Sequence, residues 1–145
     1  MAHSKAPLES GDDIEQQFYE ALQQGDIEKM MDVWSDEDDV ACIHPGGPRV
    51  VGPGAIRASF DVIFANGQVN AQPEKVRRLQ LNGAAVHHVL ERIEALTAEG
   101  PRTAWVIATN VYVKTAQGWR LVLHHASPGA AHEVQEISES ASILH

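Results

Sequence analysis

Three stretches in the first half of the chain carry apolar residues at the three- and four-residue spacing of an amphipathic helix. The predicted helices cover about residues 13–24, 26–34 and 55–65. Gly25 is a typical residue after a helix C terminus, and Asp26 is suited to cap the start of the second helix. The inward-facing apolar positions are Ile14, Phe18, Ala21, Leu22, Ile27, Met30, Met31, Trp34, Ile56, Phe60, Ile63 and Phe64.

The second half of the chain alternates between strand-forming residues and turn signals. Strands are predicted over about residues 74–81, 84–98, 102–114 and 119–126, and Asn82-Gly83 between the first two is a strong hairpin signal. Two short strands, 40–44 and 49–51, are predicted to pair across a Pro/Gly corner. Helices followed by a strand meander indicate an α+β fold, and the long strands should twist and wrap around the helices.

The size and composition predict one globular domain. The chain has 145 residues, of which 43% are hydrophobic and 21% charged, which is ordinary for such a domain. We expect a domain over residues 12–127, between a disordered N-terminal tail, 1–11, and a C-terminal tail, 128–145.

The charge and the cysteine content limit the possible binding partners and the cellular compartment of the protein. The net charge is −9 and no basic stripe is present, which argues against nucleic acid as a partner. No apolar run approaches the ~20 residues of a membrane helix, and the N terminus lacks the apolar region of a signal peptide. Cys42 is the only cysteine, so no internal disulfide can form. We therefore expect a cytoplasmic protein without a membrane partner.

His44 is the first candidate for chemistry. It lies in the segment Ile43-His44-Pro45-Gly46-Gly47-Pro48, at the corner between the two short strands. An imidazole titrates around pH ~6.5, so a histidine fixed there could accept or donate a proton near neutral pH. The alternative is that His44 hydrogen-bonds at a strand end and only shapes the turn.

Both the element order and several local motifs resemble the SnoaL-like branch of the ketosteroid-isomerase relatives, within the nuclear transport factor 2-like superfamily. The resemblance covers about residues 13–127. It implies a cone-shaped, cystatin-like fold, in which a curved mixed sheet wraps around three N-terminal helices. The chain is also similar to the association domain of calcium/calmodulin-dependent protein kinase II, which assembles that kinase into rings. The matching segments are 21–26, Trp34, 44–48, Gly52, 55–57, 109–112, 118–121 and 125–127.

The resemblance implies roles for three polar residues. His44 takes the position of the isomerases' catalytic aspartate base, and general-base catalysis is typically worth ~10²–10⁴-fold in rate. Asn110 falls where those enzymes have a protonated aspartic acid, and its amide could donate to a developing oxyanion. The alternative is a buried asparagine that satisfies backbone groups. His125 is expected to support them, although a histidine at a subunit interface would explain the same pattern.

Other positions depart from the isomerase pattern or admit a simpler interpretation. Phe18 aligns with the tyrosine that donates the isomerases' second oxyanion hydrogen bond, and Tyr19 lies about 100° further round the helix. This argues against steroid isomerase activity in the strict sense. Because side chains alternate along a strand, His87-His88 should give one exposed and one interface histidine. The residues predicted to line a ligand cavity, or else to form the core, are Phe18, Trp34, Phe60 and Tyr112.

These features predict a protein that binds a small, largely apolar organic molecule in its cone. Isomerase, cyclase or hydratase chemistry would use His44 as base, Asn110 as donor and His125 in support, without a cofactor. No metal site is expected, because the sequence lacks the paired histidine or cysteine spacing that prepares one. The competing hypotheses are a non-catalytic association domain and a carrier without chemistry. A homodimer through the outer face of the sheet is expected, because that face is apolar.

Overall fold

The computed structural model describes residues 9–129 and 136–139 of the chain, and it confirms the predicted α+β fold. No helix in these ranges is long and apolar enough to cross a membrane. Residues 1–8 of the expected N-terminal tail lie outside the described ranges, and residue 11 begins a helix. The elements are α1 (Gly11–Gln24), α2 (Ile27–Val33), β1 (Ala41–Ile43), β2 (Arg49–Val51), α3 (Pro53–Ala65), β3 (Asn70–Leu81), β4 (Ala84–Thr97), β5 (Gly100–Thr115) and β6 (Gly118–Gly129).

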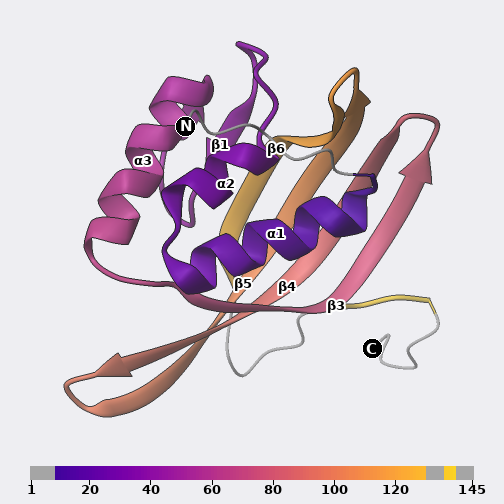
Figure 1. Ribbon diagram of the computed structural model, residues 1–145. Helices are drawn as coiled ribbons and strands as arrows, with labels where there is room; N and C mark the ends of the chain where they lie inside the picture. Colours follow the sequence, from indigo (N-terminus) through magenta and orange to yellow (C-terminus); the bar gives the residue numbers. More distant parts are fainter. Residues whose placement is uncertain (1–8, 130–135, 140–145) are drawn as a thin grey trace.

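The strands form one curved, unclosed sheet in the order β2-β1-β6-β5-β4-β3. The β1–β6 pair is parallel and the other pairs are antiparallel, so the sheet is mixed. Figure 1 shows the helices on one side of this sheet, with α1 lying across β4 and β5. We call the side that faces the helices the inner face and the opposite side the outer face.

Local chemistry explains where the helices begin and end. The side chain of Ser10 accepts a hydrogen bond from the backbone N–H of Asp13 at 3.1 Å and caps α1. Gly25, with φ of 63°, ends α1 in the left-handed conformation that glycine adopts easily. Asp26 caps α2 in the same way as Ser10 caps α1. α3 begins earlier than predicted, at Pro53, because proline is well tolerated in the first turn of a helix.

β3 is longer than predicted and begins at Asn70. Pro73 lies within it, opposite Glu91 of β4. A proline is tolerated here because β3 is an edge strand with one side free of ladder hydrogen bonds. The register shifts between Glu74 and Arg77, where Lys75 has a φ of 45°, so the edge strand carries an irregularity as well.

The core lies between the helices and the inner face of the sheet. Phe18, Trp34, Phe60 and Tyr112, the four expected cavity residues, are all buried in it. Ile14, Met30, Ile56 and Leu121 fill the space around them. A set of polar side chains shares this core, and it defines the candidate site: Glu15, His87, Glu91, Asn110 and His124.

Candidate functional site

Strand register places chemically active side chains in one row across the inner face. Cys42 of β1 pairs with His124 of β6, His124 pairs with Asn110 of β5, and Asn110 pairs with His87 of β4. Arg78 of β3 continues the row beyond His87. Because residues directly opposite each other on paired strands point to the same face, this row meets the underside of α1.

Four buried side chains, which we call the inner chain, form a continuous hydrogen-bonded path. The Tyr19 hydroxyl donates to Oε2 of Glu91 at 2.6 Å, and Nδ2 of Asn110 donates to the Tyr19 oxygen at 3.3 Å. Oδ1 of Asn110 accepts from Nδ1 of His124 at 2.5 Å. Since this oxygen only accepts, the hydrogen of the His124 ring lies on Nδ1. Each member is at most 4% exposed.

Burial decides the protonation state of the inner chain. It raises the pKa of Glu91 to about 7, although the hydrogen bond from Tyr19 acts in the opposite direction. Burial together with the nearby Glu91 charge raises the pKa of Tyr19 well above its usual value, so the hydroxyl remains a donor. Burial, with smaller contributions from the nearby His44 and His125, lowers the pKa of His124 to about 3. Glu91 is therefore the member that exchanges a proton near neutral pH.

His44 lies half-buried at the end of β1, beside the inner chain. Its Nε2 is 3.0 Å from Oγ of Ser59, whose own hydrogen is donated to the Ile56 carbonyl. Nε2 of His44 therefore donates, and Nδ1 is its acceptor. Its ring meets the Phe60 ring edge-on with centroids 4.9 Å apart. Burial lowers the pKa of His44, which favours the neutral ring at pH 7.

Cys42 lies close to His44 but is not an activated thiol. Its Sγ is 3.7 Å from Nε2 of His44. Burial, with a smaller contribution from the Glu91 charge, raises the pKa of the Cys42 thiol to about 12. The thiolate is the nucleophilic form, so Cys42 behaves as a small core residue at neutral pH.

His125, which was expected to support His44 and Asn110 in the site, does not reach the interior. His125 is exposed on the outer face, and His124 is the inward member of the pair. Alternation allowed only one of them inside, and pairing of β6 with Cys42 and Asn110 selects His124. For the other tandem pair, His88 is exposed as expected, whereas His87 lies buried beneath α1.

Tyr19, which the sequence analysis placed too far round the helix, supplies the hydroxyl of the inner chain. Tyr19 was expected to lie too far around α1, yet both Phe18 and Tyr19 are buried against the sheet. Glu15 and Leu22 are buried as well, so the inner face of α1 is wide enough for both rings. Phe18 instead provides an apolar contact, with its ring centroid 4.8 Å from that of His124. The three- and four-residue spacing of positions 15, 18, 19 and 22 was the signal in the sequence that all four share one face of the helix.

The remaining expected ligand-binding residues divide between two places. Phe60 packs near Phe18 and His44, whereas the Tyr112 hydroxyl lies 3.5 Å from Oε1 of Glu15, near the start of α1. Trp34 borders a groove of about 400 Å³ between α2 and the start of α3. The other residues along this groove are Glu28, Met31, Asp32, Ser35, Asp36, Pro53, Gly54 and Arg57.

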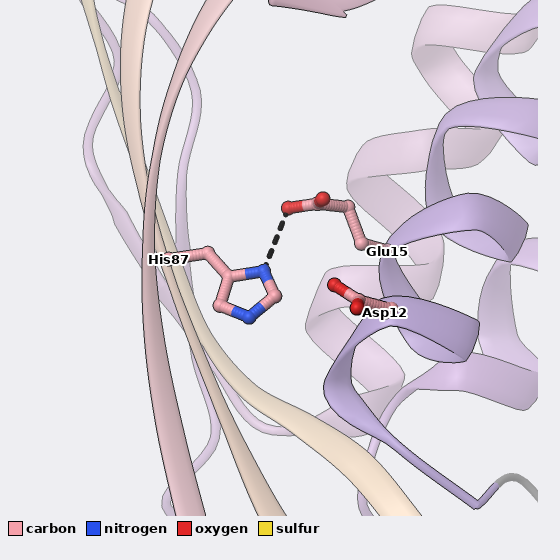
Figure 2. Close-up of side chains that lie close together, drawn as sticks. All are labelled: Asp12, Glu15 and His87. Carbon is pink, nitrogen blue, oxygen red and sulfur yellow. Dashed lines mark hydrogen bonds and ion pairs between the residues drawn. The ribbon is translucent and has the colours of Figure 1, made fainter. Parts of the chain in front are cut away.

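A second polar group, the N-terminal cluster, consists of Asp12, Glu15 and His87 (Figure 2). Nδ1 of His87 lies 2.9 Å from Oε1 of Glu15, and both side chains are buried. Asp12 is exposed, and Nε of Arg78 donates to its Oδ1 at 2.7 Å. One ligand-capable atom from each of the three cluster residues lies within 4.8 Å of the other two. Sequence reasoning missed this cluster because it joins α1 to a distant strand.

The comparisons with known proteins agree with one another on the family of this chain. A sequence profile described as the SnoaL-like domain matches residues 12–131. A solved structure from Thiobacillus denitrificans, described as a calcium/calmodulin-dependent protein kinase type II association domain, is 35% identical. That match covers 86% of this chain and 99% of the other, with a TM-score of 0.78.

Two further solved structures extend the comparison. A protein from Streptomyces avermitilis, described as a dehydratase of the NTF2-like family, is 29% identical over 81% of this chain and 93% of that chain, with a TM-score of 0.72. The S. rosetta CaMKII hub is 20% identical over 88% of this chain and 100% of that chain, with a TM-score of 0.67, and it supports the fold alone. No match was found among curated protein sequences.

Proposed function

The chain belongs to the SnoaL-like domain family, and from this and the inner chain we propose that its cone binds a small, largely apolar organic molecule and transfers a proton on it. The observation that supports this is the inner chain itself. Burying polar groups is unfavourable unless every partner is present, so a core that only has to fold is served better by apolar side chains. Carboxyl groups with strongly displaced pKa values are typical of proton-transfer sites.

The proposed chemistry assigns one role to each polar residue. In its ionised form Glu91 accepts a proton from a carbon of the bound molecule, and in its protonated form it returns one. Asn110 and Tyr19 are assigned as donors to the oxygen where negative charge develops. The Tyr19 hydroxyl, which donates to Glu91 in this structure, would turn its one hydrogen to that oxygen when the ligand binds. His124 holds the Asn110 amide so that Nδ2 points toward Tyr19.

His44 completes the proposal at the accessible end of the inner chain. It is half-buried, whereas the inner chain is fully buried, so we place the entry path of the ligand beside His44. Its neutral ring is suited to act as a second proton acceptor. Phe18 and Phe60, which contact the two histidine rings, would form the apolar wall.

Binding is tested through the side-chain amide of Asn110. We expect a panel of uncharged cyclic ketones and phenols to contain compounds that shift the NMR signals of this amide, and the matched hydrocarbons without oxygen to shift them less. Glu91→Gln should keep the fold and change the affinity for these compounds, whereas Glu94→Gln, at the half-exposed end of the same strand, should not. Compounds that bind while leaving the Asn110 amide unshifted would contradict the proposed site.

An association module is the second candidate, and a specific observation favours it. The outer face carries half-buried Val86, Val111 and Leu123 in one row, and Ile107 nearby is 38% exposed. The 35% identical protein is described as an association domain. Apolar faces of this kind mark contacts between proteins, so we propose a homodimer through the outer face. The two functions are compatible, because they use opposite faces of the sheet.

We also propose that the protein acts in the cytoplasm and needs no nucleic acid partner. The arguments are the single cysteine, the acidic net charge of −9 and the lack of a basic stripe. Cell fractionation followed by detection of the native protein would test the location.

A further inference from the structure

We propose that the N-terminal cluster binds a divalent transition-metal ion, with Asp12, Glu15 and Nδ1 of His87 as protein ligands. Two carboxylates and one imidazole form a donor set that suits ions such as Zn²⁺. Three protein ligands leave a coordination position for water. The cluster shares no residue with the inner chain, although His87 pairs directly with Asn110 in the sheet.

The fold brings these ligands together from two rigid elements. Asp12 and Glu15 stand three residues apart in the first turns of α1, so they share one side of the helix. Gly11 allows this turn to approach β4 closely, because a Cβ there would come within 3.3 Å of Nε2 of His87. His87 rises from β4 to meet them, as Figure 2 shows.

The present spacing is close to what a metal requires. The ligand atoms lie within 4.8 Å of one another. In a tetrahedral zinc site with bonds of about 2.0–2.2 Å, neighbouring ligand atoms are about 3.4 Å apart. The 2.9 Å pair of Glu15 and His87 is already this short, so mainly the exposed Asp12 side chain has to move.

Metal binding would replace a proton and a cation that the cluster now holds. Nδ1 of His87 donates its hydrogen to Glu15. When the ion takes Nδ1, the ring hydrogen moves to Nε2, because an imidazole ligand binds through one nitrogen and keeps its hydrogen on the other. Arg78 now neutralises Asp12, with its Nη2 4.0 Å from Oε2 of Glu15. The side chains of Arg78 and Asp12 are 50% and 62% exposed, so this ion pair is weak and can open into water.

Glu15 would keep the same orientation with and without the bound ion. The Tyr112 hydroxyl donates to Oε1 of Glu15 at 3.5 Å, and its ring meets the His87 ring edge-on with centroids 4.8 Å apart. Partners of this kind, which hold the ligands without touching the metal, are a regular feature of metal sites.

The test is a titration of the full chain, first freed of metal with a chelator, with Zn²⁺ by calorimetry and with Co²⁺ by visible absorption. We expect one ion per chain with a dissociation constant well below about 1 mM. His87→Gln should weaken binding at least about 10-fold, and so should Asp12→Asn. His88→Gln is the matched control, because His88 is the adjacent residue on the outer face, and it should leave binding unchanged.

Arg78→Gln is the most specific variant in this test. Removing the competing positive charge should strengthen Zn²⁺ binding about 10-fold, the opposite direction to the ligand variants. Circular dichroism identifies any variant that fails to fold, and we expect Asp12→Asn and Arg78→Gln to fold because both side chains are exposed. Absence of binding, binding that survives both ligand substitutions, or weaker binding in Arg78→Gln would each overturn the proposal.

Discussion

Glu91 and His124 are two buried residues whose pKa values are strongly displaced. Glu91 has a pKa raised to about 7, and His124 has a pKa lowered to about 3, in each case mainly by burial. Both belong to the inner chain, and both shifts connect protonation to the free energy of unfolding. Both shifts destabilise the fold, Glu91 as the pH rises and His124 as the pH falls, so each needs its own test.

Replacing Glu91 with glutamine should remove a loss of stability at high pH. Between about pH 4.5 and 7 the folded protein holds a proton on Glu91 that the unfolded chain releases, so rising pH destabilises the fold. The contribution reaches about 3 kcal/mol. We therefore expect Glu91→Gln to gain up to about 3 kcal/mol relative to wild type between about pH 5 and 8 in urea unfolding. Glu94→Gln should show the pH dependence of wild type. If the stability of Glu91→Gln also changed with pH as that of wild type does, the pKa of Glu91 would not be raised in the folded protein.

Replacing His124 should remove a loss of stability in acid. The unfolded chain takes up a proton on this histidine below about pH 6.5, whereas the buried ring stays neutral down to a pKa of about 3. At about pH 4.5 this linkage destabilises wild type by about 3 kcal/mol relative to neutral pH. His124→Asn, which can still donate to Asn110, should lose correspondingly less. His125→Asn on the outer face is the control, and equal acid sensitivity in His124→Asn would refute a buried neutral ring.

The elements were largely predictable, because their signals are local. Capping by Asp26, the glycine after α1 and the Asn82-Gly83 turn all depend on neighbours in sequence. The extent of β3 was not predictable, because a proline is acceptable only on an edge strand and edge position depends on the whole sheet.

The candidate site was predictable only in part. Sequence reasoning selected Asn110, which lies in the inner chain, and His44, which lies beside it. Alternation along β6 allows only one of His124 and His125 inside, and the family resemblance favoured His125. The pairing of β6 with β1 and β5 places His124 there instead. Glu91 and Tyr19 lie 72 residues apart in the sequence, and no local pattern indicates their contact.

The contact between α1 and the sheet gives a prediction at the scale of the element. A Cβ at Gly11 would lie 3.3 Å from both Nε2 of His87 and Cδ2 of Tyr112, two buried rings with little room to move. Gly11→Ala should therefore destabilise the protein by about 1 kcal/mol or more in urea unfolding. Gly54→Ala at the start of α3, where a Cβ meets nothing within 4 Å, should instead stabilise by up to about 1 kcal/mol. Stabilisation by both substitutions would mean that α1 can shift away from the sheet.

The molecule combines a group of polar side chains inside an apolar core with a row of apolar residues on the outer face. The inner chain and the N-terminal cluster both lie between α1 and the sheet, while Val86, Val111 and Leu123 lie on the far side. This division permits association through one face and ligand binding behind the other.

Association is tested by the mass of the protein in solution, measured by light scattering. We expect wild type to be a dimer of the 15.8 kDa chain, and Val111→Glu to be a monomer, because it places a charge at the centre of the outer face. Val62→Glu, at a 66% exposed position on α3, should remain a dimer. A monomeric wild type would rule out the outer face as an interface, and a larger ring would favour the association function.

Proton transfer inside the cone is the central claim, and hydrogen exchange on a bound compound tests it most directly. A cyclic ketone that shifts the Asn110 amide is incubated in deuterium oxide, and loss of its α-proton signal is followed by NMR. We predict that wild type and Glu94→Gln accelerate this loss above the buffer rate, and that Glu91→Gln does not, because the glutamine amide cannot accept the proton. Exchange at the buffer rate with every bound ketone, or an undiminished rate in Glu91→Gln, would contradict the claim.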